Sequence, residues 1–200
     1  MRRRTAATFL LLAVLFVLTA CGQADGGGSA LTETSGNAAP AQGADDSNNS
    51  MLWEIPDEYR VGDIPADFEV ELLNGEMITL SDLKGKVVLL NFWDLSCKLC
   101  LLEMPAFDML LDKYGDDLVI LAINSGDRKE KIEKYMSENS HSFKVGVDRA
   151  RVIQFPGDAI PYSLVIDRQG TIQSVHTGGT GEADQDFIRY DSEIEKLLGQ

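Results

Sequence analysis

Residues 86–100 read KVVLLNFWDLSCKLC, an apolar run that ends in two cysteines, Cys97 and Cys100. The continuous apolar segment from Val87 to Trp93 is typical of a strand that is buried on both faces of a sheet. From about Cys97 to Tyr114 the apolar residues recur at the spacing of a helix. This stretch therefore predicts a buried strand that leads directly into a helix, with the cysteine pair at the junction.

The remaining segments predict short elements around this junction. Residues 68–80 are expected to form a hairpin, because apolar and polar residues alternate before the turn signal Asn74-Gly75. The other expected elements, in chain order, are a helical turn at 81–85, a buried strand at 118–123, a polar helix at 128–139, a strand at 143–147, a hairpin at 162–176 and a helix at 187–198. A strand–helix–strand unit gives parallel strands with a right-handed crossover, so this order predicts an α/β fold whose mixed central sheet has helices on both faces.

Residues 1–20 combine Arg2–Arg4 with an apolar run, which is the pattern of an export signal. The run is short for a transmembrane helix, which needs about 20 apolar residues. It ends in the motif LTAC at Cys21, which resembles the lipobox of bacterial lipoproteins. The resemblance implies a lipoprotein signal peptide, cleavage before Cys21 and a diacylglyceryl group on its sulfur. The alternative is an ordinary secretory signal with a chance cysteine.

A lipidated Cys21 would carry at least two acyl chains, which is enough to anchor the mature chain on the outer side of a membrane. Residues 21–50 are rich in Gly, Ala, Ser, Asp and Asn, with hardly any large apolar side chain. Such a segment cannot bury enough surface to offset its ordering entropy, so it predicts a disordered tether. Residues 51–200 are long enough to form one domain with its own core.

The chain has 18 Lys+Arg and 32 Asp+Glu, and the mature form without Arg2–Arg4 would carry a net charge of −17. This acidity disfavours nucleic acid as a partner, because phosphate binding depends on clustered Lys and Arg. It also disfavours adhesion to anionic lipid, so the lipid on Cys21 would have to provide the membrane attachment.

If Cys21 is lipidated, Cys97 and Cys100 are the only free thiols, and they lie in an oxidising compartment. A structural disulfide is expected to close a longer loop, because it then constrains the unfolded chain more. At the start of a helix, free backbone N–H groups and the helix dipole favour a thiolate on Cys97, and Lys98 adds positive charge beside it. Cys100 lies three residues further on the same helix face, so it can resolve a mixed disulfide at Cys97.

The order of strand, CxxC motif and helix resembles the thioredoxin fold. Three segments, VGDIPADFEVELLNGEMITLSDLKGKVVLLNFW (61–93), EMPAF (103–107) and IPYSLVIDRQG (160–170), resemble the TlpA/ResA-like branch of membrane-tethered extracytoplasmic thiol-disulfide oxidoreductases. The resemblance covers roughly residues 61–198. It implies a thioredoxin fold with an N-terminal β-hairpin extension, and an enzyme that exchanges thiols and disulfides in proteins.

The resemblance also implies roles for single residues. Cys97 would be the exposed nucleophile and Cys100 the resolving thiol of a redox-active disulfide. Pro161, which follows Ile160, matches the family's cis-proline, which lies beside the cysteines and presents backbone to the substrate; a trans proline at a strand edge is the alternative. Glu103 matches an acidic residue that would raise thiol pKa values and could relay a proton, and a solvated helix residue is the alternative interpretation.

Four residues depart from the family or from its cytoplasmic relatives. Ser96 stands where Trp usually precedes the first cysteine, and Leu99 stands where Pro often precedes the second. Asp94 replaces a small apolar residue and is expected to raise the pKa of Cys97, whereas Lys98 is expected to lower it. Asn91 stands where cytoplasmic thioredoxins carry a buried Asp; this substitution fits the membrane-tethered branch and removes a buried proton acceptor. The opposing charges leave the sign of the change in reduction potential open.

The resemblance implies a bacterial cell-envelope protein without a cofactor, on the outer face of the cytoplasmic membrane or in the periplasm. We expect a reductant that receives electrons from a membrane protein. The implied clients are protein thiols or disulfides, for example apocytochrome c before haem attachment or a partner such as a methionine sulfoxide reductase. A disulfide-forming oxidase would use the same residues, because the direction depends on potential and partners.

Other functions agree less well with the residues. A peroxiredoxin needs Thr or Ser three residues before its reactive cysteine and Pro four residues before that, but these positions hold Asp94 and Leu90. A copper-handling module uses CxxxC with a distant histidine; His176 fits, but the cysteine spacing is one residue short. A zinc site needs about four ligands, and only His176 and His141, each expected at the surface, could join the cysteines. Inert packing of the cysteines and a degenerate docking domain are the remaining alternatives.

Overall fold

The structure is a computed structural model that describes residues 58–157 and 159–199; the predicted signal peptide, Cys21 and the tether lie outside these residues. Its elements, in chain order, are β1 (Glu69–Glu71), β2 (Met77–Thr79), the 3₁₀ turn η1 (Leu80–Leu83), β3 (Val87–Trp93), α1 (Lys98–Tyr114), the 3₁₀ turn η2 (Gly115–Asp117), β4 (Leu118–Ser125), α2 (Lys129–Asn139), β5 (Lys144–Asp148), β6 (Tyr162–Ile166), β7 (Ile172–Thr177) and α3 (Ala183–Leu198). None of these helices is long and apolar enough to cross a membrane.

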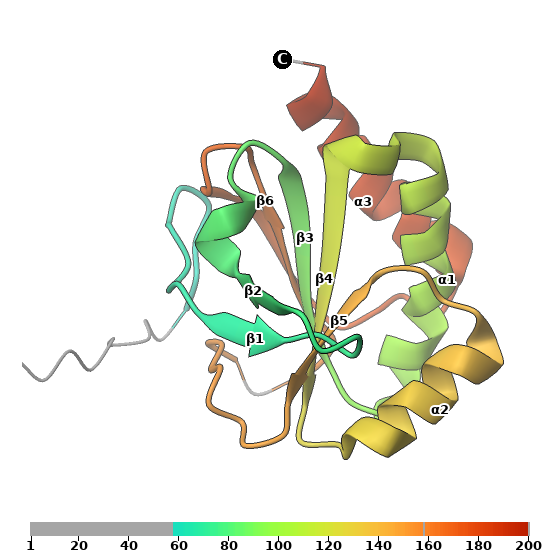
Figure 1. Cartoon of the computed structure of the whole chain (residues 1–200). Coiled ribbons are helices and arrows are strands. Elements are labelled where there is room, and N and C mark those ends of the chain that lie inside the picture. Colours follow the sequence, from blue (N-terminus) through green and yellow to red (C-terminus); the bar gives the residue numbers. More distant parts are fainter. Residues whose placement is uncertain (1–57, 158, 200) are drawn as a thin grey trace, which may run out of the picture. The chain divides into compact units, whose positions relative to one another are not determined.

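Five strands form one mixed sheet in the order β5-β4-β3-β6-β7. β3, β4 and β5 run parallel, whereas β6 is antiparallel to β3 and β7 is antiparallel to β6. The parallel connections contain α1 and α2, because parallel neighbours need a long crossover. β3 is therefore the central strand, and its C-terminal end leads into α1 (Figure 1).

Every residue of β3 is buried, as its continuous apolar run predicts. Successive side chains of a strand point to opposite faces of the sheet. Val87, Leu89 and Trp93 contribute to one hydrophobic core, and Val88 and Leu90 contribute to a second core on the other face. The central strand is thus enclosed on both sides.

All three helices pack on the first of these cores, through residues such as Met104 of α1, Ile132 of α2 and Ile194 of α3. The hairpin β1–β2 and η1 cover the second core through residues such as Val70 and Leu80 (Figure 1). The expectation of helices on both faces is therefore wrong. The two crossovers step in the same direction, from β3 to β4 and from β4 to β5, so right-handed connections place α1 and α2 on the same face.

The hairpin β1–β2 also covers the edge of the sheet at β5. The Leu73 N–H donates to the Val145 carbonyl at 3.0 Å, and Leu72 forms an antiparallel bridge with Gly146. The approach is close, because a Cβ on Gly146 would lie 3.0 Å from Val70 Cγ2 of β1, as well as 2.7 Å from Ile123 Cδ1 of β4. This contact protects backbone groups that an edge strand otherwise leaves open to pairing with another chain.

Helix α3 begins at Ala183, about one turn before Phe187, where the apolar pattern begins. The additional turn contains Asp184, Gln185 and Asp186, and their polarity conceals it in the sequence. Asp186 is nevertheless fully buried. This turn brings a charged side chain into the interior next to α1.

Gly146→Ala is expected to lower the free energy of unfolding by about 1–3 kcal/mol, the usual effect of overpacking a core. The added methyl group would overlap Ile123 Cδ1 and approach the methyl groups of Val70. Urea unfolding of the full-length oxidised protein measures the change. Ile123→Val removes the overlapping methyl group, so the double variant should lose less stability than the sum of the two single variants. Strictly additive losses would contradict the contact.

Candidate active site

Cys97 occupies the N-cap position of α1, directly before the first helical residue, Lys98. Cys97 and Cys100 form a disulfide, with their Cα atoms 5.3 Å apart. The Cys100 N–H donates to Cys97 Sγ at 3.1 Å, so this sulfur takes the place of a capping oxygen. Cys97 is partly exposed and Cys100 is fully buried, so Cys97 is the sulfur that another protein can reach.

The turn before Cys97 is organised by the Asp94 carboxylate. Asp94 Oδ1 accepts hydrogen bonds from the Ser96 N–H at 2.8 Å, the Ser96 hydroxyl at 2.7 Å and the Cys97 N–H at 2.9 Å. The Leu95 N–H donates to Asp127 Oδ2 at 2.8 Å, which connects the turn to the segment after β4. Asp94 therefore shapes the turn in addition to placing a negative charge near Cys97, a structural role that its position in the sequence does not reveal.

The segment before β6 lies beside the disulfide. The Ile160–Pro161 peptide bond is cis, and the Ile160 carbonyl oxygen lies 3.6 Å from Cys97 Sγ. The Pro161 carbonyl accepts a hydrogen bond from the Gly178 N–H at 2.7 Å. An open groove of about 460 Å³ adjoins Asp94 and Ile160. Backbone and open space thus lie together next to the partly exposed sulfur.

Ser96, Lys98 and Leu99 are exposed residues around Cys97. Leu99 packs on the loop that follows β7, where a Cβ on Gly179 would lie 3.3 Å from the Leu99 carbonyl oxygen. The departures from the family pattern that surround the disulfide therefore lie at the protein surface.

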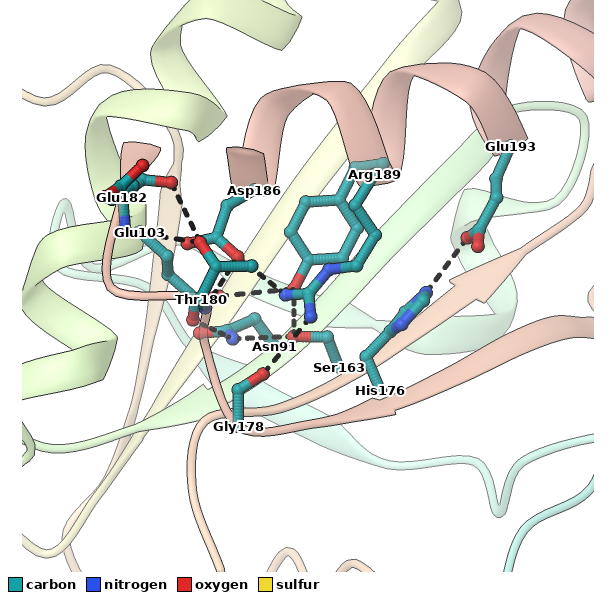
Figure 2. Close-up of polar contacts among 11 residues, drawn as sticks. Asn91, Glu103, Ser163, His176, Gly178, Thr180, Glu182, Asp186, Arg189 and Glu193 are labelled. Atoms are coloured by element: carbon teal, nitrogen blue, oxygen red, sulfur yellow. Dashed lines mark hydrogen bonds and ion pairs between the residues drawn. The ribbon is translucent and has the colours of Figure 1, made fainter. Parts of the chain in front are cut away.

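A buried polar cluster begins one helical turn beyond Cys100, at Glu103 (Figure 2). The exposed fraction is 0% for Glu103, Asn91 and Tyr190 and 1% for Ser163. Asn91 Nδ2 donates to Glu103 Oε1 and to Ser163 Oγ, both at 2.9 Å. The Tyr190 hydroxyl lies 3.2 Å from Glu103 Oε2 and 3.1 Å from Ser163 Oγ. Two predicted residues, Asn91 and Glu103, are thus in direct contact.

Burial raises the pKa of Glu103 to about 8, and the negative charge of Asp186 adds to this rise. Hydrogen bonds from Tyr190 and Asn91, together with the charge of Arg189, act in the opposite direction. The interpretation of Glu103 as a solvated helix residue is therefore wrong. A carboxyl group with this pKa can change its protonation state near neutral pH.

Asp186 and Arg189 extend the cluster to the loop that follows β7 (Figure 2). Arg189 Nη2 donates to Asp186 Oδ1 at 2.8 Å and to the Tyr190 hydroxyl at 3.2 Å. Asp186 Oδ1 also accepts from the Thr180 N–H at 3.1 Å, and Arg189 Nη1 donates to the Gly178 carbonyl at 3.4 Å. Because the Gly178 N–H binds the Pro161 carbonyl, hydrogen bonds connect Glu103 to the segment beside Cys97.

Asp186, Arg189 and Tyr190 are not among the functional residues predicted from the sequence. The apolar pattern of the last helix begins at Phe187, so it leaves Asp186 outside the predicted helix. Their spacing could have indicated a shared site, because Asp186, Arg189 and Tyr190 stand at positions i, i+3 and i+4, which lie on one face of a helix. Ser163, within an apolar strand, gave no separate signal.

Both histidines are largely buried and do not lie at the surface as expected. His141 Nδ1 lies 2.7 Å from Asp108 Oδ2, and His176 Nε2 lies 3.0 Å from Glu193 Oε2. Their side chains are 6% and 16% exposed. Within the described part of the chain, no three His, Cys, Asp or Glu side chains are grouped to hold a metal ion. His176 points toward Glu193 (Figure 2), so its position does not favour the copper-handling alternative.

Comparisons of the sequence identify relatives of this chain. Residues 61–175 match the model of the AhpC/TSA family. The thioredoxin-like protein YneN of Bacillus subtilis is 35% identical over 116 residues, which cover 56% of this chain and 68% of the relative. The thiol-disulfide oxidoreductase ResA of Halalkalibacterium halodurans is 35% identical over 126 residues, which cover 62% of this chain and 72% of the relative.

Solved structures agree with these relatives. A Chlorobium tepidum structure assigned as the thiol:disulfide interchange protein DsbE is 26% identical with a TM-score of 0.62, covering 70% of this chain and 98% of the other. The pneumococcal exposed lipoprotein thioredoxin of Streptococcus pneumoniae is 28% identical with a TM-score of 0.53, covering 66% and 100% of the two chains. The predicted thioredoxin fold is confirmed. The chain belongs to the AhpC/TSA family, and it is a thioredoxin-fold thiol-disulfide oxidoreductase of the TlpA/ResA type.

Proposed function

We propose that the protein is tethered in the bacterial cell envelope and reduces client disulfides with the Cys97–Cys100 dithiol. One observation carries this proposal: a disulfide at the N-terminus of α1 has one partly exposed sulfur, and a titratable buried carboxyl, Glu103, lies one turn beyond the other. The arrangement separates a sulfur that meets the client from a sulfur that completes the reaction inside the protein.

In the first step, the Cys97 thiolate attacks one sulfur of the client disulfide. The Cys97–client bond forms, the client S–S bond breaks, and the released client thiolate takes up a proton. The free N–H groups and the dipole of the first turn of α1 stabilise the attacking thiolate. The Ile160 carbonyl beside Cys97 Sγ and the adjoining groove would receive the client backbone.

In the second step, Cys100 attacks Cys97 Sγ and expels the second client thiol. The Cys97–Cys100 disulfide forms, so two electrons have passed to the client. Cys100 must first lose its proton, and the carboxylate of Glu103 would accept it. The pKa of about 8 for Glu103 is well above that of an ordinary carboxyl group, so its carboxylate is a stronger base than usual and is partly present near neutral pH.

We further propose that a lipid on Cys21 holds the chain at the membrane through a tether at residues 21–50, with the domain at 51–200. The lipobox-like LTAC motif supports the anchor, as does the likeness to a protein described as an exposed lipoprotein thioredoxin. A membrane electron donor would return the disulfide to the dithiol. The clients would be proteins with disulfides exposed outside the cytoplasm, such as an apocytochrome c or an envelope methionine sulfoxide reductase.

The direction of electron flow is tested by the reduction potential of the Cys97–Cys100 pair. Equilibration of the full-length protein with dithiothreitol or glutathione measures it. A reductant is expected to have a potential near that of thioredoxin, about −270 mV. A potential near about −120 mV, as in a strong oxidant, would instead indicate a disulfide-forming enzyme.

The roles of the two cysteines are tested by single substitutions. Cys97→Ser is expected to abolish exchange, because it removes the sulfur that reaches the client. Cys100→Ser is expected to trap mixed disulfides with the client, because the resolving thiol is missing. Non-reducing electrophoresis of cells that produce each variant detects these adducts. Full activity of both variants would rule out this mechanism.

Glu103→Gln is expected to slow the second step by about 10²- to 10⁴-fold, the usual contribution of a general base. The carboxylate is the active form, so the wild-type rate should rise as the pH rises through about 8. This rise should be absent in the variant. The measurement is the release of a coloured thiol from a mixed disulfide at Cys97.

Asp112→Asn provides a matched control for Glu103→Gln, because it removes an exposed carboxylate from the same helix. This control should keep both the wild-type rate and its pH dependence. An unchanged rate in Glu103→Gln would show that another group accepts the proton of Cys100.

A further inference from the structure

Tyr190 connects the two carboxyl groups of the buried polar cluster. Its hydroxyl contacts Glu103 Oε2 and accepts a hydrogen bond from Arg189, which in turn binds Asp186. The Arg189 guanidinium lies 4.9 Å from the centre of the Tyr190 ring, and the ring of His176 meets Tyr190 edge-on at 5.3 Å. These contacts fix the position of the hydroxyl oxygen between Glu103 and Ser163.

The hydroxyl of Tyr190 can serve both protonation states of Glu103, because a phenol both donates and accepts. When Glu103 is a carboxylate, Tyr190 donates to Oε2. When Glu103 is protonated, Oε2 donates to the Tyr190 oxygen, and Tyr190 donates to Ser163 Oγ at 3.1 Å instead. The change requires a rotation of the O–H bond and no movement of a heavier atom.

We infer that Tyr190 is a positioning residue that holds Glu103 Oε2 in place while the carboxyl group gains and loses a proton. The inference rests on the proposed function, in which Glu103 exchanges that proton with Cys100. In this step the S–H bond of Cys100 breaks, an O–H bond forms at Glu103, and the hydroxyl of Tyr190 turns to Ser163. No electron moves until the resulting thiolate attacks Cys97.

Groups from every neighbouring element face Glu103. They are Asp186, Arg189 and Tyr190 of α3, Asn91 of β3 and Ser163 of β6, and Cys100 lies one turn before Glu103 on α1. His176 of β7, which contacts Glu193, meets the ring of Tyr190. Burial and Asp186 raise the pKa of Glu103, and the hydrogen bond from Tyr190 lowers it. Loss of the Tyr190 hydroxyl and loss of the Asp186 charge should therefore shift this pKa in opposite directions.

Tyr190→Phe tests the inference, because it removes one oxygen and keeps the ring. The readout is the infrared band of the protonated Glu103 carboxyl in the full-length oxidised protein, identified by its loss in Glu103→Gln. The midpoint of its titration is expected to rise by about one pH unit or more, since hydrogen bonds to charged groups are the stronger ones. The second step of exchange at pH 7 should then be about tenfold slower, because about tenfold less carboxylate is present.

Tyr114→Phe is the matched control. The Tyr114 hydroxyl also bridges α1 and α3, by a hydrogen bond of 2.7 Å to Asp191, but it belongs to a separate group with Lys113 and Asp191 that does not include Glu103. This substitution should leave the midpoint unchanged. An equal rise in both variants would mean that the effect is general to the contact between the helices, and it would overturn the inference.

The direction of the shift distinguishes positioning from packing. If the hydroxyl of Tyr190 only filled space, its loss would admit water, and the midpoint would fall toward that of a solvated carboxyl. A falling or unchanged midpoint in Tyr190→Phe overturns the inference. Asp186→Asn is a second variant, for which a lower midpoint is expected and a higher one is contradictory.

The infrared titration uses the oxidised protein without a client, so it does not depend on thiol exchange. Failure of the proposed function would be seen separately, as an unchanged second step in Glu103→Gln. A raised midpoint in Tyr190→Phe together with an unchanged second step in Glu103→Gln would keep the positioning role and reject the proton transfer.

Discussion

The enclosure of β3 on both faces is the constraint on which the rest of the structure depends. The strand pairs with β4 on one side and with β6 on the other, and a hydrophobic core covers each of its faces. Its path is therefore fixed as far as Trp93, and the chain must leave the sheet and begin α1 within a few residues. In that turn the Asp94 carboxylate accepts from the N–H groups of Ser96 and Cys97, and Asp127 accepts from the N–H of Leu95. Cys97 Sγ is consequently presented to the free N–H groups of the helix, where a thiolate is stabilised.

The buried polar cluster beside this junction costs free energy to form, because its polar and charged groups are removed from water. A carboxyl group without exposed surface favours its neutral form. Asp186 is also fully buried, although its partner Arg189 is partly exposed, and removing such charges from water costs free energy that the ion pair only partly restores. Hydrogen bonds from Asn91 and Tyr190 offset part of the cost for Glu103. Strongly shifted carboxyl groups in such settings are found at functional sites more often than elsewhere. Glu103 lies one turn beyond the resolving cysteine, so its raised pKa would suit it to accept the proton of Cys100.

The strand, the cysteine pair and the first helix could be predicted because each has a local signal: a continuous apolar run, a spacing of three residues and a helical period. Local signals of this kind do not show on which face of the sheet each helix packs. That face depends on the order of strands in the sheet, and two crossovers in the same direction put α1 and α2 on one face. The burial of Glu103 was also hidden, because it requires α3 to pack over α1. That packing brings Tyr190, 87 residues away in the chain, into contact with the carboxyl group.

The residues that distinguish this chain from the family pattern, and the one that distinguishes it from cytoplasmic thioredoxins, lie in two places. Ser96 and Leu99 replace residues that flank the disulfide on its exposed side, and Leu99 packs on the loop that follows β7. Asn91 lies inside and donates to Glu103 Oε1, so this position holds an amide that cannot compete with Glu103 for a proton. The outer residues touch whatever binds at Cys97, whereas the inner ones touch the group that handles the proton. Substitutions at surface residues such as Ser96 and Leu99 can therefore alter which client proteins bind at Cys97. The buried Glu103 would still accept the proton of Cys100 in the reaction with each client.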